Sequence, residues 1–207
     1  MNDFSIAMAL VDYIPVFLFG AAAVLLQRDL YNKMSKGCFA LFAAGTINVF
    51  IAGFLKATWK LLYAAGICDF TALDDMFFPV QSIGFLLVGI AVVAMLGFRQ
   101  EKATVLTVAP PVFTGTFFFV GLMVAGLGCM DFGLSALALR LKQKKAVILF
   151  AVSFVCCLCM GYLSAQDFTQ SFMNWLAQGI NVVGQGTFLA AVFMLHKAGL
   201  KELTWEK

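Results

Sequence analysis

The sequence predicts an all-α protein that crosses a membrane several times, and two observations carry this prediction. The 207-residue chain is 62% hydrophobic and only 12% charged, about half the charged fraction of an ordinary soluble domain. Several apolar runs also reach the roughly 20 residues that a helix needs to cross a bilayer. These runs are solid apolar blocks, whereas the strands of a membrane β-barrel alternate apolar and polar residues. The pattern therefore favours helices.

Five spans follow directly from the apolar runs. They are predicted at 4–27, 37–60, 76–98, 146–164 and 171–195. The first run carries Asp3 and has no basic region in front of it, so it is interpreted as a span rather than a cleaved signal peptide. Residues 103–139 are harder to divide, because this stretch is generous for one helix and short for two.

The charges of the loops indicate how often 103–139 crosses. Four basic clusters occur, which are Arg28, Lys33 and Lys36; Arg99 and Lys102; Arg140, Lys142, Lys144 and Lys145; and Lys197 and Lys201. Cytoplasmic loops collect Lys and Arg, and the four clusters share one side only if this stretch crosses twice. We therefore predict seven spans in the plasma (cytoplasmic) membrane, with the N-terminus outside and the C-terminus cytoplasmic. Six spans, arranged as three plus three, remain the alternative, because the Ala-Pro-Pro sequence and the glycines suit a broken or re-entrant segment.

An internal repeat indicates two parallel three-helix units. LFAAGTINVFIAGFLKA at 41–57 aligns without a gap on LFAVSFVCCLCMGYLSA at 149–165, and DFT at 69–71 matches DFT at 167–169. Two units of the same charge orientation need one linking span between them. The predicted division is a first three-helix repeat at 1–102, a linking span at 103–121, and a second three-helix repeat with a short C-terminal tail at 122–207.

This layout, three helices plus one plus three with the N-terminus outside, resembles that of the SWEET sugar transporters and other PQ-loop proteins. The resemblance concerns layout only, because their Pro-Gln motif is missing from the ends of the first and fifth helices, and PVQS at 79–82 lies within the third span instead. Microbial rhodopsins also have seven spans, but no lysine occurs between Gln170 and Leu195 to bind retinal. No family is assigned from motif residues.

Polar residues inside the spans provide the strongest functional signal. Asn174, Gln178, Asn181 and Gln185 follow one another at spacings of 4, 3 and 4 in the last span, which places them in one stripe on a helix. The stripe covers roughly 16 Å of the helix axis, about half of the hydrocarbon core. One or two amides often join helices by hydrogen bonds, whereas four in register predict a polar cavity walled chiefly by the last helix.

Three further polar residues extend this candidate substrate-binding site. Asn48 lies near the middle of the second span, Gln81 about two turns inside the third, and Asp131 near the middle of the fifth. A single Asn or Gln commonly makes a packing hydrogen bond. A carboxylate in the middle of a membrane is expensive unless it is protonated, paired or hydrated, so Asp131 is predicted to be functional.

The stretch GFLKATWKLLYAAGICDFTALDD places two lysines at the end of an apolar run. With the N-terminus outside, Lys56 and Asp12 both lie in the outer halves of their spans, and we predict that they face each other at an outer vestibule. The alternative is that Lys56 extends along its helix to reach water. Lys60 is interpreted as interfacial, beside Trp59 and Tyr63 in an aromatic belt.

No cofactor or metal is expected. Cys156, Cys157 and Cys159 form CCLC inside one span, a spacing that cannot wrap a tetrahedral zinc ion, and they are interpreted as apolar packing residues. His196 is the only histidine, which argues against a histidine-based metal site. The net charge of +3 is spread over the loops, so no nucleic-acid partner is expected. Membrane lipid and an unidentified small molecule are the expected partners, with a homo-oligomer left open.

Together these residues predict a transporter or channel-like protein for a small polar solute, with its site near the bilayer midplane between the two repeats. Two alternatives come from other functional classes. The first is an intramembrane enzyme that modifies a lipid, with Asp12 and Asp131 as acid and base beside the lysines. The second is a ligand-sensing membrane subunit, for which the sequence contains no signalling domain. No catalytic residue is assigned, and no feature identifies a substrate.

Overall fold

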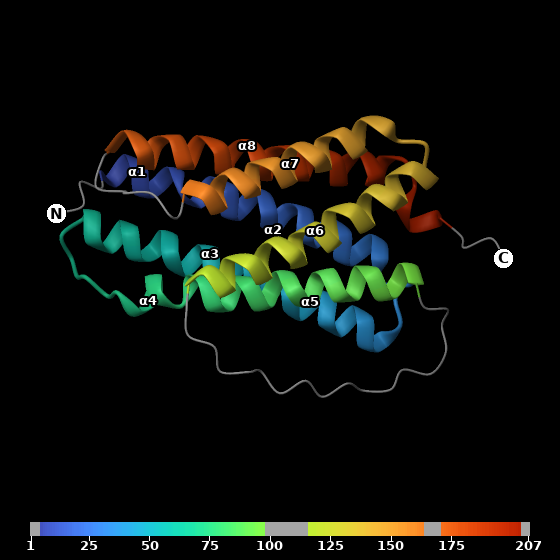
Figure 1. Cartoon of the computed structure of the whole chain (residues 1–207), viewed down its shortest axis with the longest axis horizontal. Helices are drawn as coiled ribbons and strands as arrows, with labels where there is room; N and C mark the ends of the chain where they lie inside the picture. Colours follow the sequence, from blue (N-terminus) through green and yellow to red (C-terminus); the bar gives the residue numbers. More distant parts are fainter. Residues whose placement is uncertain (1–4, 98–115, 164–170, 204–207) are drawn as a thin grey trace.

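The computed structural model describes residues 5–97, 116–163 and 171–203, and all regular structure within these ranges is helical (Figure 1). Within the described ranges, six helical segments are long and apolar enough to cross a membrane. Large apolar side chains lie on their outer faces, among them Val24, Ile90, Phe132, Ile148 and Val183, which are 48–69% exposed. Such a surface is unfavourable in water, whereas lipid covers it. The predicted all-α polytopic membrane fold is confirmed.

Eight α-helices and one short 3-10 helix make up the regular structure of the described residues. In chain order they are α1 (Ile6–Val11), α2 (Tyr13–Leu30), α3 (Lys36–Ala64), α4 (Ala72–Asp75), α5 (Phe77–Gly97), α6 (Thr116–Arg140), α7 (Lys144–Leu163), α8 (Ser171–Lys197) and the 3-10 helix η1 (Leu200–Glu202). The five directly predicted spans coincide with helices to within a few residues.

The predicted boundary between the linking span and the second repeat falls inside α6. Residues 116–121 form the first turns of this helix rather than the end of a separate span. They are mostly apolar and no proline divides them from the residues that follow, so the helix continues through them. The rest of the predicted linking span, 103–115, lies outside the described residues.

The first span is divided into α1 and α2 at Asp12. Pro15 explains the division, because it has no N–H to donate and its ring opposes the carbonyl of Val11, four residues earlier. Asp12 therefore lies at a break in the helix, near the end of the bundle where the chain begins (Figure 1). This break positions its carboxylate for the site described below.

The helices cross the bundle in a repeated order of directions (Figure 1). α2, α3 and α5 run forward, back and forward, and α6, α7 and α8 do the same. Side-chain and backbone contacts agree with this view: Gly126 abuts Phe85 and Leu86, while further along Gly133 abuts Val92. Because residue numbers rise together on both helices, α5 and α6 are parallel.

A second parallel pair, α2 and α8, joins the two sets of three helices on the other side. Phe19 stacks on Phe188 with ring centroids 6.0 Å apart, and further along both helices His196 Nδ1 lies 2.8 Å from Asp29 Oδ2. Each helix also packs against its neighbour within its own set. The long segments therefore form a closed ring in the order α2, α3, α5, α6, α7 and α8.

The bundle has an acidic end and a basic end. The acidic end holds α4 and the starts of α1, α5, α6 and α8, together with Asp69, Asp74 and Asp75 (Figure 1). The basic end holds the ends of α2, α5, α6 and α8. Three of the four basic clusters therefore lie at one end of the bundle, and the fourth, Arg99 and Lys102, lies outside the described residues.

The half of the bundle toward the basic end, hereafter the basic half, is filled by apolar side chains. Leu26, Leu30, Val88, Val92, Leu134, Leu137 and Leu195 are each at most 1% exposed. The polar side chains of the basic half pair with one another. Gln27 Nε2 donates a 2.7 Å hydrogen bond to Thr46 Oγ1, and Asp29, which is 2% exposed, pairs with His196. The other half, hereafter the acidic half, is built differently.

Candidate functional site

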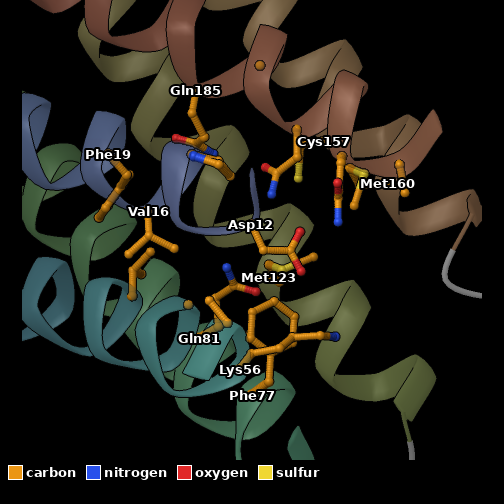
Figure 2. Close-up of a pocket in the computed structure, with 18 of the residues that line it drawn as sticks. Asp12, Val16, Phe19, Lys56, Phe77, Gln81, Met123, Cys157, Met160 and Gln185 are labelled. Atoms are coloured by element: carbon orange, nitrogen blue, oxygen red, sulfur yellow. The ribbon is translucent and has the colours of Figure 1, made fainter. Parts of the chain in front are cut away.

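A cavity of about 370 Å³ occupies the acidic half of the bundle. Its lining residues extend from Asp74 and Lys60 at the acidic end to Phe85 and Gln185, which lie near the middle of their helices. α4 and every long segment contribute to the wall. Figure 2 shows Asp12, Gln81 and Gln185 around the same space. The volume falls in the range of pockets that hold small molecules.

The amide stripe of α8 lines this cavity along its length. Asn174, Gln178, Asn181 and Gln185 all belong to the wall, so the stripe is turned toward the bundle interior. Gln178 Nε2 donates a 2.9 Å hydrogen bond to Met8 O, whereas its buried Oε1 has no hydrogen-bond partner among the described residues. A buried acceptor without a partner is costly. Gln178 Oε1 is therefore suited to accept a hydrogen bond from a bound solute or water.

The other predicted residues within the spans lie in different places. Gln81 lines the cavity from α5, opposite the stripe (Figure 2). Asn48 is half-buried on α3 and does not belong to the wall. Asp131 is 2% exposed on α6 and also lies outside the wall. The structure thus brings Gln81 together with the amides of α8 and separates Asn48 and Asp131 from them.

Two ion pairs lie at the mouth of the cavity. Lys60 Nζ is 2.5 Å from Asp12 Oδ2, and Lys56 Nζ is 3.4 Å from Asp74 Oδ1. Lys56 also lies over the Phe77 ring, 4.1 Å from its centroid. Asp12 and Lys56 both line the predicted vestibule, but Asp12 pairs with Lys60 instead of Lys56. The interpretation of Lys60 as an interfacial residue therefore missed its ion pair with Asp12. Lys56 takes its partner, Asp74, from α4, a short helix that was not predicted.

Four phenylalanines, hereafter the aromatic plug, lie at the inner end of the cavity, where Phe19 and Phe85 line it and the other two pack behind Phe19. The plug consists of Phe19, Phe85, Phe150 and Phe188, from α2, α5, α7 and α8. Phe19 contacts Phe85 edge-on and stacks on Phe188, which in turn contacts Phe150 edge-on at 5.8 Å between centroids. Phe150 and Phe188 are at most 1% exposed. Beyond the plug the described helices of the basic half are packed with apolar side chains.

Sequence reasoning missed most of the aromatic wall. Phe50, Phe77, Phe78 and Phe85 all line the cavity, and nothing distinguished them from the other phenylalanines in the sequence. The lining residues of α5 are Phe77, Phe78, Gln81 and Phe85. Of these the sequence predicted Gln81 alone, because an apolar run does not fix how its helix is rotated about its axis.

The chemistry of the cavity follows from which charges are paired. Both lysines at the mouth have carboxylate partners, and the deeper wall contributes uncharged amides, Ser153, thiols and aromatic rings. Such a surface offers hydrogen bonds and ring faces without a net charge to attract an ion. Asp12 lines the mouth while Asp131 is outside the wall, so the two carboxylates do not flank one reaction centre.

Comparison with known proteins adds no assignment to this geometry. No family model, no curated protein and no solved structure matches the chain.

Proposed function

We propose that this chain is a membrane transporter or channel-like protein that binds a small polar solute in the cavity of its acidic half. The observation that carries the proposal is a cavity lined by four amides of α8, paired charges and apolar, partly aromatic side chains, inside a bundle whose outer surface suits lipid. Four amides turned toward lipid would each lose their hydrogen bonds with water. Their position around a cavity instead fits a solute that forms hydrogen bonds.

The proposed molecule consists of two equivalent units, α1 to α5 and α6 to α8. The shared order of helix directions supports this division, as does the ring in which α5 packs on α6 and α8 on α2. A two-fold axis along the bundle would relate such units, as in transporters built from parallel repeats. The cavity then lies between the units and ends near the bilayer midplane, where transporters of this design hold their solutes.

A seventh crossing is part of the proposal. α5 ends at the basic end and α6 begins at the acidic end (Figure 1), so the chain between them must connect opposite ends of the bundle. We assign this connection to the part of the predicted linking span that precedes α6. The basic end is proposed to be cytoplasmic, because Lys and Arg collect there. In that orientation the cavity opens to the outside and the aromatic plug closes it toward the cytoplasm.

Labelling from the two sides of the membrane tests this topology. Lys33→Cys and Lys142→Cys, each in a chain without its native cysteines, are expected to react with a membrane-impermeant maleimide only from the cytoplasmic side. Ile67→Cys, between α3 and α4, is the matched control and is expected to react only from outside. Labelling of Lys33→Cys and Lys142→Cys from opposite sides would contradict the seven-span arrangement and favour six spans.

Water access to the cavity tests the function more directly. In the same background, Gln185→Cys is expected to react with the impermeant maleimide from outside, because its position lines the open cavity. Val183→Cys, on the same helix but 53% exposed toward lipid, is the control and should stay unmodified. Gln185→Cys that resists the reagent from both sides, in a folded protein, would count against an aqueous pathway.

Solute binding completes the test. A panel of small uncharged polar solutes can be screened for a rise in Tm, since a ligand that binds only the folded state stabilises it. Solutes that raise the Tm are then assayed for uptake into proteoliposomes. We expect uptake by the native chain and loss of both uptake and Tm shift in Asn181→Leu combined with Gln185→Leu. Binding without uptake would favour the ligand-sensing alternative.

A further inference from the structure

Asp131 is a deeply buried carboxylate outside the cavity, and it has no hydrogen-bond or ion-pair partner among the described residues. Its side chain lies on α6, and the residue is 2% exposed. Neither carboxylate oxygen has a hydrogen-bond partner within the described part of the chain. Asp29 is equally buried, but it pairs with His196 at the basic end. The isolation of Asp131 therefore sets it apart from the other buried acid.

Asp131 lies just beyond the inner end of the cavity. Met123, Leu127 and Asp131 are successive positions four residues apart on α6, so they share one face of the helix, and the first two line the cavity. The carboxylate is also within electrostatic range of Cys157 on α7, which lines the cavity as well. One helical turn and one thiol thus separate Asp131 from the cavity.

Among the described residues, none near Asp131 provides a compensating charge. α5, which packs against α6, carries no titratable residue between Phe77 and Gly97. From α7 the titratable group facing it is Cys157, a neutral thiol donor at most. The basic residues of α6 and α7 lie at their basic-end termini. An ionised carboxylate in such a place would be strongly unfavourable.

We propose that Asp131 is a proton-binding site that couples solute movement to proton movement in the same direction. Asp131 takes up a proton from water in the outward-facing cavity, and the carboxyl holds this proton while the basic half is packed. When the two units move apart at the basic end, water reaches the carboxyl, its O–H bond breaks, and the proton leaves to the cytoplasmic water. The inference rests on the proposed transport function for its coupling, but the proton site itself can be tested alone.

A permanently neutral structural residue is the competing explanation, and the position argues against it. An uncharged carboxyl without hydrogen-bond partners adds no interaction that an apolar side chain of similar size would lack. Asp131 also occupies the level of the aromatic plug, where the cavity would have to extend if it opened toward the basic end. A group that exchanges a proton there would be gated by the same movement that releases the solute.

Infrared spectroscopy of the purified full chain in lipid vesicles tests the proton site without any solute. A protonated carboxyl has a carbonyl stretching band separate from that of a carboxylate. We expect this band in the native chain at neutral pH, its loss as the pH is raised, and its absence from Asp131→Asn. Asp12→Asn is the matched control and should keep the band, because Asp12 is ion-paired with Lys60. Asp131→Glu should restore a titrating band.

Two results would overturn the proton site. In the first, Asp131→Asn has the same carbonyl bands as the native chain, which would mean that Asp131 is ionised. In the second, the band is present but does not change at any pH at which the protein stays folded, which would mean a permanently neutral group. If Asp131→Asn fails to fold, the native chain is treated with an apolar carbodiimide, which modifies protonated carboxyls, and absence of modified Asp131 overturns the inference.

Coupling is measured separately in proteoliposomes that contain a pH-sensitive dye, with the uncharged solute that gives the largest Tm shift. Solute addition should acidify the lumen with the native chain, whereas Asp131→Asn should exchange solute across the membrane without moving protons. Solute uptake by the native chain without acidification would overturn the coupling and leave the transport function standing. A titrating Asp131 in a chain that binds no solute would support the proton site and contradict the transport function.

Discussion

The acidic and basic halves of the bundle are made by the same six long segments, yet one half encloses a cavity and the other is solid. In the basic half, α2, α5, α6 and α8 contribute leucine, valine and alanine side chains that fill the space between them. In the acidic half the long segments and α4 together contribute amides, paired charges, aromatic rings and aliphatic side chains that line the cavity. Mean hydropathy is high along every segment, so hydropathy alone does not decide which part of a membrane bundle is filled by side chains and which part encloses a cavity.

The largest expected effect comes from removing a ring of the aromatic plug. Phe188→Ala should lower the free energy of unfolding by about 3–5 kcal/mol, because it leaves an enclosed void in a well-packed site. Phe77→Ala is the matched control at the cavity wall, where the removed ring already borders open space, and its effect should be much smaller. Reversible unfolding in lipid–detergent micelles measures both. Equal losses in the two variants would mean that the halves do not differ in packing.

A smaller effect is expected where α5 and α6 approach most closely. A Cβ at Gly126 would lie 2.5 Å from Leu86 N, so Gly126→Ala must push the two backbones apart and should cost about 1–3 kcal/mol of unfolding free energy. Gly121→Ala, on the same helix, meets nothing within 4 Å and should instead stabilise the chain by roughly 0.5–1 kcal/mol. The same unfolding assay compares them. A neutral Gly126→Ala would show that this contact between the units is loose.

The smallest effect on stability is expected at the amide stripe. Asn181→Leu and Gln185→Leu should each change the unfolding free energy by no more than about 0.5 kcal/mol, because their side chains face a cavity that does not depend on them for packing. Leu134→Asn places an amide in the packed basic half and should cost about 1–3 kcal/mol. If the two cavity variants were as damaging as Leu134→Asn, the stripe would be structural rather than a solute site.

The sequence predicted the fold class and the helix positions because they depend on local composition. Apolar runs long enough to span a bilayer became helices almost where predicted, and the spacing of Asn174, Gln178, Asn181 and Gln185 placed them on one inner face. Both inferences use only the geometry of a single helix. The pairing of helices around a ring is a property of the whole chain, and no local pattern in the sequence predicted it.

The partners of individual side chains were also hard to predict, because they depend on how several helices pack together. Asp12 pairs with Lys60 rather than Lys56 because α4 brings Asp74 to Lys56, and a four-residue helix leaves little signal in a sequence. Asp131 was placed with the substrate-binding residues because its depth in a span was known but its rotation about α6 was not. Its separation from the wall depends on a single turn of that helix.

The contact between α2 and α8 has a consequence for the order in which the protein is made. Asp29 and His196, and likewise Met8 and Gln178, are separated by most of the chain. During synthesis α2 enters the membrane long before α8 exists, so Asp29 lacks its imidazole partner and the ring of helices stays open on one side. Non-local contacts of this kind form late in folding. A chain that loses α8 therefore lacks the imidazole partner of Asp29 and the helix that carries the amide stripe of the cavity.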